Sequence, residues 1–135
     1  MQTKTALEWK MIEECRTLGG CDIGEAKITA GYNLKAKFII HTVGPVYCRD
    51  DENLLTACYR NSLELARKYG IHSIAFPSIS TGKFCFPKDK ATRMAVTAIR
   101  GWMADNADYE MQVVLSCIDH RIYDMACEEI QNDRG

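Results

Sequence analysis

The chain has 135 residues, of which 47% are hydrophobic and 26% are charged, and its formal net charge is -1. This length and balance are typical of one folded globular domain and exclude a disordered chain. A charge so close to zero argues against a protein that holds nucleic acid by bulk positive potential, and no apolar run approaches the ~20 residues needed to cross a membrane. We therefore expect a single domain over residues 1–135, with neither a membrane segment nor a sequence-specific nucleic-acid partner.

The seven cysteines show no disulfide framework. Their number is odd, their spacings are irregular, and no Cys-x-x-Cys pair occurs. The three histidines are scattered, so the residues predict no zinc site. Thiols of this kind are typical of a reducing compartment, and we expect a cytoplasmic protein.

Hydrophobic periodicity and turn residues divide the chain into alternating helices and strands. The expected elements are a helix over Thr5–Leu18, an edge strand Ala26–Ala30, a strand Lys37–Val43, a helix Glu52–Tyr69, a strand Ile71–Ile79, a loop Ser80–Pro87, a helix opened by Pro87, a strand Gln112–Cys117 and a helix from His120. Strands that alternate with helices of this length indicate an α/β domain whose strands are buried on both faces of a largely parallel sheet.

Each helix has an apolar face that we assign to the core rather than to a cofactor. The expected core residues are Leu54, Leu55, Cys58, Ser62, Leu65, Ala66 and Tyr69, then Ala91, Met94, Ala95, Ala98 and Trp102, then Ile122, Met125, Ala126 and Ile130. His41, at a strand end, is interpreted as a structural residue rather than a base.

The segment Ser78–Phe84 is the best candidate for chemistry, because ligands of α/β sheets bind beyond the carboxyl ends of the strands. Its small hydroxyl residues let backbone N–H groups approach an anion, and Gly82 permits a turn with positive φ. Phe84 and Phe86 offer aromatic faces for a ribose or a base. A plain strand-to-helix turn that needs a glycine explains the same composition, and both readings stay open. A Walker A loop does not fit, because Pro77 and Phe84 occupy its Gly and Ser/Thr positions.

Three segments in order resemble the macrodomain family, an ADP-ribose-binding α/β module. They are Gly24–Leu34, Ile40–Pro45 and Ala75–Phe84, and the resemblance runs from about residue 12 to residue 135. It is strongest to the bacterial branch that hydrolyses ADP-ribosyl and O-acetyl-ADP-ribose bonds. The resemblance implies a three-layer α/β/α fold with a mixed, largely parallel sheet.

By this resemblance, the ligand contacts fall on Ile79, Ser80, Thr81, Gly82, Lys83, Phe84 and Asp119. The segment Ser80–Lys83 would place backbone amides on the diphosphate, and Phe84 would lie against the distal ribose. Ile79 would line the floor, and Asp119 would lie near the adenine. Cys85 stands where many relatives have glycine, which predicts a stiffer or differently angled loop. The resemblance implies no cofactor and no metal.

The family's first two strands and its glycine-rich loop have no counterpart in this sequence, so we read the chain as N-terminally truncated and assign no catalytic residue. One absent strand would lie between the strands around Ile39 and Ile74, and unpaired strand edges are costly. We therefore expect a homodimer or larger assembly. The expected function is binding of ADP-ribose or its derivatives. Hydrolysis of ADP-ribosyl or O-acetyl-ADP-ribose bonds stays open, because the family resemblance favours it but the family's catalytic segment has no counterpart here. The alternatives are a non-catalytic binding module for a nucleotide diphosphate, or a truncated chain with impaired binding.

Overall fold

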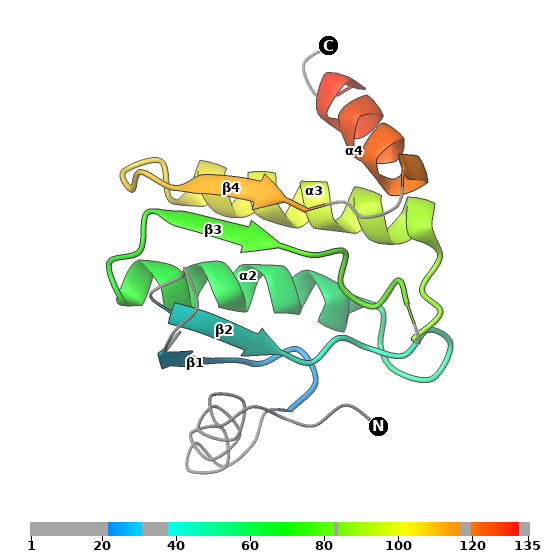
Figure 1. The fold of residues 1–135 in the computed structure, drawn as a ribbon, viewed down its shortest axis with the longest axis horizontal. Helices are drawn as coiled ribbons and strands as arrows, with labels where there is room; N and C mark the ends of the chain where they lie inside the picture. The colour runs from blue at the N-terminus through cyan, green and yellow to red at the C-terminus, as the bar shows by residue number, and fades with distance from the viewer. Residues whose placement is uncertain (1–21, 31–37, 83, 117–119, 133–135) are drawn as a thin grey trace, which may run out of the picture.

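The computed structural model describes residues 22–30, 38–82, 84–116 and 120–132. The elements in chain order are β1 (Ala26–Ala30), β2 (Phe38–Thr42), α2 (Asn53–Lys68), β3 (Ser73–Phe76), α3 (Lys88–Asp105), β4 (Gln112–Leu115) and α4 (His120–Asn132). In Figure 1, α2 and α3 lie side by side behind the strands, and α4 extends from the end of α3 at which β4 terminates. The expected helix over Thr5–Leu18 lies outside the described residues.

The strands form two separate pairs. β1 and β2 are antiparallel, with Ile28 opposite Ile40, whereas β3 and β4 are parallel, with Ile74 opposite Val113. Among the described residues no ladder joins β2 to β3. The mixed sheet expected from the sequence is therefore present as two halves. Phe76 of β3 contacts the Tyr59 ring on α2, and Phe38 of β2 contacts the ring of Tyr69, which directly follows α2.

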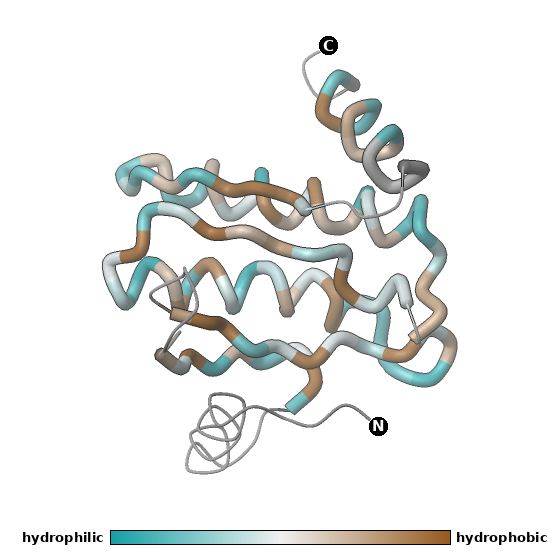
Figure 2. Tube along the Cα trace, in the orientation of Figure 1, coloured by the Kyte–Doolittle hydropathy of each residue, from teal (hydrophilic) through white to brown (hydrophobic). Residues whose placement is uncertain are grey.

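The hydrophobic core lies between the strands and the pair α2 and α3. Its most buried large side chains are Trp102, Tyr59, Leu55 and Leu63. Figure 2 shows the corresponding hydrophobic stretches along β3, β4 and the two helices. Burying such side chains contributes about 1.5–3 kcal/mol each, so this layer is the main source of stability.

Two features of the core differ from the sequence prediction. The strands were expected to be buried on both faces, but β3 and β4 alternate, with Ala75 and Val114 exposed and Phe76 buried. The reason is that α2 and α3 cover only the face to which Phe76 points. Tyr69 was expected in the core and is 50% exposed, because it follows the last turn of α2.

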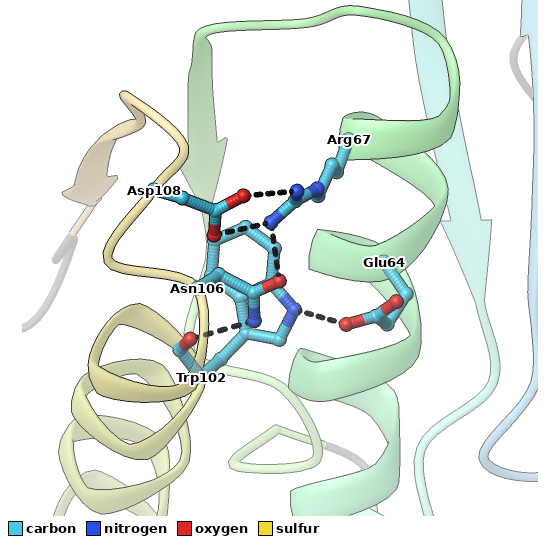
Figure 3. Close-up of polar contacts among 5 residues, drawn as sticks. All are labelled: Glu64, Arg67, Trp102, Asn106 and Asp108. Atoms are coloured by element: carbon cyan, nitrogen blue, oxygen red, sulfur yellow. Dashed lines mark hydrogen bonds and ion pairs between the residues drawn. The ribbon is translucent and has the colours of Figure 1, made fainter.

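A polar cluster joins the C-terminal ends of α2 and α3 (Figure 3). The buried Trp102 indole donates a 2.6 Å hydrogen bond to Glu64, and Arg67 forms a two-point ion pair with Asp108. Arg67 also donates to Asn106, whose amide caps the Trp102 carbonyl. These contacts fix the angle between the helices far from the β3–α3 loop, so we interpret the cluster as structural.

No helix in the described ranges is both long enough and apolar enough to cross a membrane.

Candidate functional site

The segment between β3 and α3 folds into a compact turn at the carboxyl end of β3 (Figure 1). Two backbone hydrogen bonds close it, from Phe86 N to Ser80 O and from Cys85 N to Gly82 O, both 3.0 Å long. The expectation that Gly82 takes the positive φ is wrong: Ser80 (φ 66°) and Cys85 (φ 58°) do so. The chain therefore reverses at two non-glycine residues, and such positions cost free energy in side-chain-bearing residues.

Hydrogen bonds from a side chain of α2 anchor the start of the β3–α3 loop. The Tyr59 hydroxyl accepts a hydrogen bond from Ile79 N at 3.2 Å and donates to Pro77 O at 3.4 Å. Tyr59 is 1% exposed, so this bond pair lies in the core. Because one phenol bridges both backbone groups, the start of the loop is anchored to a rigid helix.

The end of β2 also supports the loop. Gly44 packs so tightly against it that a Cβ built on Gly44 would lie 2.1 Å from Ser80 Oγ and 2.7 Å from Ile79 Cγ2. The Ser80 hydroxyl is buried there, and no described residue pairs with it. A residue with a side chain at position 44 would therefore displace the loop.

The backbone amides at the tip of the loop are the central feature of the site. In the described part of the chain, no hydrogen bond uses the N–H of Ser80, Thr81 or Gly82 as a donor. The Thr81 hydroxyl is turned inward and donates to Ser78 O at 2.9 Å. Successive unpaired amides in a turn attract anions, and the N-terminus of α3 at Lys88 lies a few residues further along. The arrangement can hold a phosphate or diphosphate without a metal.

A second loop, residues 43–50, lies along the first. Tyr47 N donates to Phe84 O at 3.0 Å, and the Tyr47 ring meets Phe86 edge-on with centroids 5.1 Å apart. Phe86 is 2% exposed and belongs to the core, so it is not a ligand platform as the sequence suggested, whereas Phe84 is 37% exposed. Lys90 contacts the Tyr47 ring, and its hydrogen bond to Glu52 raises the pKa of the ammonium group.

The structure describes five of the seven predicted ligand-binding residues. Ile79 packs against the core at the floor of the loop, Ser80, Thr81 and Gly82 follow it in the turn, and Phe84 comes two residues after Gly82. Lys83 and Asp119 lie outside the described residues.

The supporting residues Tyr59, Gly44 and Tyr47 were missed as site residues. Only Gly44, in a Gly-Pro pair after a strand, carried a sequence signal for a close backbone approach.

Fold and loop together define an α/β protein with a candidate anion site beyond a parallel strand. The chain belongs to the Macro domain family, whose family model matches residues 2–95. It is 54% identical over 99 residues to a macro domain-containing protein of Methanosarcina mazei, a match that covers 71% of this chain. The chain spans only 53% of the length of that relative.

Two further comparisons agree. The chain is 42% identical over 121 residues to human ADP-ribose glycohydrolase MACROD2, which covers 84% of this chain and 28% of the human protein. The Trypanosoma brucei macrodomain in complex with ADP-ribose superposes with a TM-score of 0.83 at 34% identity, covering 90% of this chain and 51% of that one. The macrodomain-like α/β fold expected from the sequence is therefore confirmed.

Proposed function

We propose that this chain binds ADP-ribose or an ADP-ribosyl derivative at the β3–α3 loop. The observation that carries the proposal is the run of amides at Ser80, Thr81 and Gly82, none of which donates to a described residue. A diphosphate is the part of the ligand that such a run suits, since each oxygen accepts more than one hydrogen bond. The similarity to a macrodomain structure that holds ADP-ribose supports the choice of ligand.

The other assignments belong to the same proposal. The exposed ring of Phe84 lies against the ribose, Ile79 forms the floor, and Lys83 extends the amide run. Asp119 contacts the adenine. Residues 1–135 act as a single domain, and the thiol chemistry of the chain suits a cytoplasmic location.

The test is calorimetry with ADP-ribose on the wild type and two loop variants. Nothing lies within 4 Å of a Cβ built on Gly82, and its φ is not left-handed, so Gly82→Ala leaves the fold intact. The new methyl group stands where the phosphate approaches the backbone, and losing one charge-assisted hydrogen bond, worth about 1.5–3 kcal/mol, weakens binding roughly tenfold or more. Gly82→Glu adds a negative charge and weakens binding further.

Phe84→Ala tests the aromatic contact. Its matched control is Phe38→Ala, because Phe38 is similarly exposed (41% against 37%) and lies on β2. We expect weaker binding for Phe84→Ala and unchanged binding for Phe38→Ala. No heat and no change in melting temperature with millimolar ADP-ribose would refute the proposal.

A second candidate function is hydrolysis of an ADP-ribosyl bond, which is favoured by the 42% identity to a protein named as an ADP-ribose glycohydrolase. Incubation with O-acetyl-ADP-ribose or an ADP-ribosylated protein, followed by chromatography of the products, distinguishes the two. Turnover above the buffer rate supports the enzyme, whereas tight binding without turnover supports a binding module.

A further inference from the structure

Two exposed cysteines flank the contact between the loops at the site. Cys48 follows Tyr47 in the 43–50 loop, and Cys85 follows Phe84 in the β3–α3 loop. The backbone hydrogen bond from Tyr47 N to Phe84 O, 3.0 Å long, joins the residues immediately before them. Each thiol therefore sits one residue beyond a point where the two loops touch.

This placement puts the two cysteines on touching loops, each one residue beyond a residue of the 3.0 Å backbone contact. Consecutive Cα atoms are about 3.8 Å apart, and a disulfide spans Cα separations of about 4.4–6.8 Å. The backbone hydrogen bond joins the Tyr47 N–H group to the carbonyl of the peptide group that precedes Cys85, so a bridge forms when the two loops bring the Cα atoms of Cys48 and Cys85 into this range. Both cysteines also have positive φ, at 65° and 58°, so the backbone at each is in a conformation that few side-chain-bearing residues adopt.

The surroundings of Cys48 differ from those of the buried cysteine in α2. Cys48 and Cys85 are both exposed, and oxidation of thiols depends on exposure. Cys58, by contrast, is buried, and its thiol donates to Val43 O. Exposure therefore distinguishes the two loop cysteines from Cys58.

We propose that Cys48 and Cys85 form a reversible disulfide when the protein meets hydrogen peroxide. One thiolate attacks a peroxide oxygen, the O–O bond breaks, and a sulfenic acid forms while the other oxygen leaves as water. The second thiol then attacks the sulfenic sulfur, and its hydroxyl group leaves as a second water. Two thiols supply two electrons to the peroxide, and the bridge ties the loop that carries Ser80–Phe84 to the loop after β2.

The sequence makes the bridge easy to map. Trypsin places each of the seven cysteines in a different peptide, with Cys48 in residues 38–49 and Cys85 in residues 84–88. The purified chain is treated with hydrogen peroxide, alkylated without reduction, digested and analysed by mass spectrometry. A 1:1 mixture of unlabelled and nitrogen-15-labelled protein separates bridges within a chain from bridges between chains.

We expect one dominant cross-link, between peptides 38–49 and 84–88, found only as light–light and heavy–heavy pairs and removed by dithiothreitol. Cys48→Ser and Cys85→Ser abolish it, and Cys127→Ser on α4 keeps it. The melting temperature of the wild type rises by several degrees on oxidation, because the bridge closes a loop of the unfolded chain, and that of Cys48→Ser does not. Absence of this peptide pair, or mixed light–heavy pairs alone, overturns the proposal.

A regulatory role for the bridge rests on the proposed function and is measured on the same samples. We expect ADP-ribose affinity to differ at least threefold between reduced and oxidised wild type and to be equal in the two states of Cys48→Ser. If the reduced protein does not bind ADP-ribose, the proposed function is contradicted and the disulfide proposal is not. A mapped bridge with unchanged affinity contradicts the regulatory role alone.

Discussion

Gly44 and Ser80 are in such close contact that the end of β2 and the loop after β3 can occupy their places only if residue 44 has no side chain. A Cβ on Gly44 would lie 2.1 Å from Ser80 Oγ, which is far shorter than a nonbonded contact of a Cβ atom. The two strands share no described ladder, so this contact links the two halves of the sheet at their carboxyl ends. The position of the candidate site therefore depends on a glycine from the other half.

Gly44→Ala should both destabilise the fold and weaken ADP-ribose binding. Overpacking of this kind costs about 1–3 kcal/mol, and its relief requires Ser80 and Ile79 to move. Urea unfolding and calorimetry measure the two effects. Gly101→Ala in α3 is the control, because its Cβ would meet only the end of the flexible Arg60 side chain. Full stability and affinity in Gly44→Ala would show that the loop does not depend on this approach.

Tyr59→Phe should loosen the loop from α2. The substitution keeps the ring against Phe76 but leaves the Ile79 N–H in the core without its acceptor. We expect a loss of about 1–3 kcal/mol in the free energy of unfolding and faster hydrogen exchange at Ile79. Tyr69→Phe, at a half-exposed tyrosine, should change neither. Unchanged exchange at Ile79 would mean that another group holds the loop.

Cys85→Gly should stabilise the protein. A left-handed backbone costs about 1–2 kcal/mol for a residue with a side chain and nothing for glycine, although glycine gains entropy in the unfolded state. With φ of 58° at Cys85, we expect a net gain of about 1 kcal/mol in denaturant unfolding. Cys127→Gly, inside α4, should instead lower stability. A loss of stability in Cys85→Gly would show that its side chain makes contacts that outweigh the strain.

Asp108 should make stability fall at low pH. Its hydrogen bonds to Arg67 lower the pKa of the carboxyl group below its usual value. A carboxyl group whose pKa is lowered on folding contributes stability above its unfolded pKa of about 3.9, and that contribution is lost as the pH falls through the lower, folded value. Asp108→Asn should therefore flatten the decline in unfolding midpoint below about pH 4. Asp124→Asn on α4 serves as the control, and equal slopes for wild type and Asp108→Asn would contradict the assignment.

The gap between β2 and β3 leads us to expect self-association. In the described part of the chain no ladder joins β2 to β3, and strand edges of this kind favour pairing with another chain, as the sequence already suggested. Light scattering at low micromolar concentration should report a homodimer or larger assembly. A clean monomer there would contradict this expectation and would indicate that the gap is closed within one chain.

Much of the fold could be predicted because local patterns decide it. The apolar spacing from residue 52 to residue 69 predicts α2, and Pro87 predicts the start of α3. The structure confirms α2 and the start of α3 to within one residue. Tyr59 and Leu63, which are buried, fell outside the predicted face of α2. The reason is that α2 contacts α3 as well as the strands, so its buried surface is wider than one stripe.

The loop between β3 and α3 also has features that the sequence predicts and features that only the tertiary structure decides. Its composition and its place after a strand indicated by themselves that residues 78–84 form either an anion site or a plain strand-to-helix turn, because small residues and a strand end are local features. Only the tertiary structure decided that Ser80 and Cys85 bend the chain, that Phe86 enters the core, and that Tyr59 and Gly44 hold the turn. Those outcomes depend on side chains and backbone from α2 and β2, which lie far away in sequence and come within contact distance only when the chain folds.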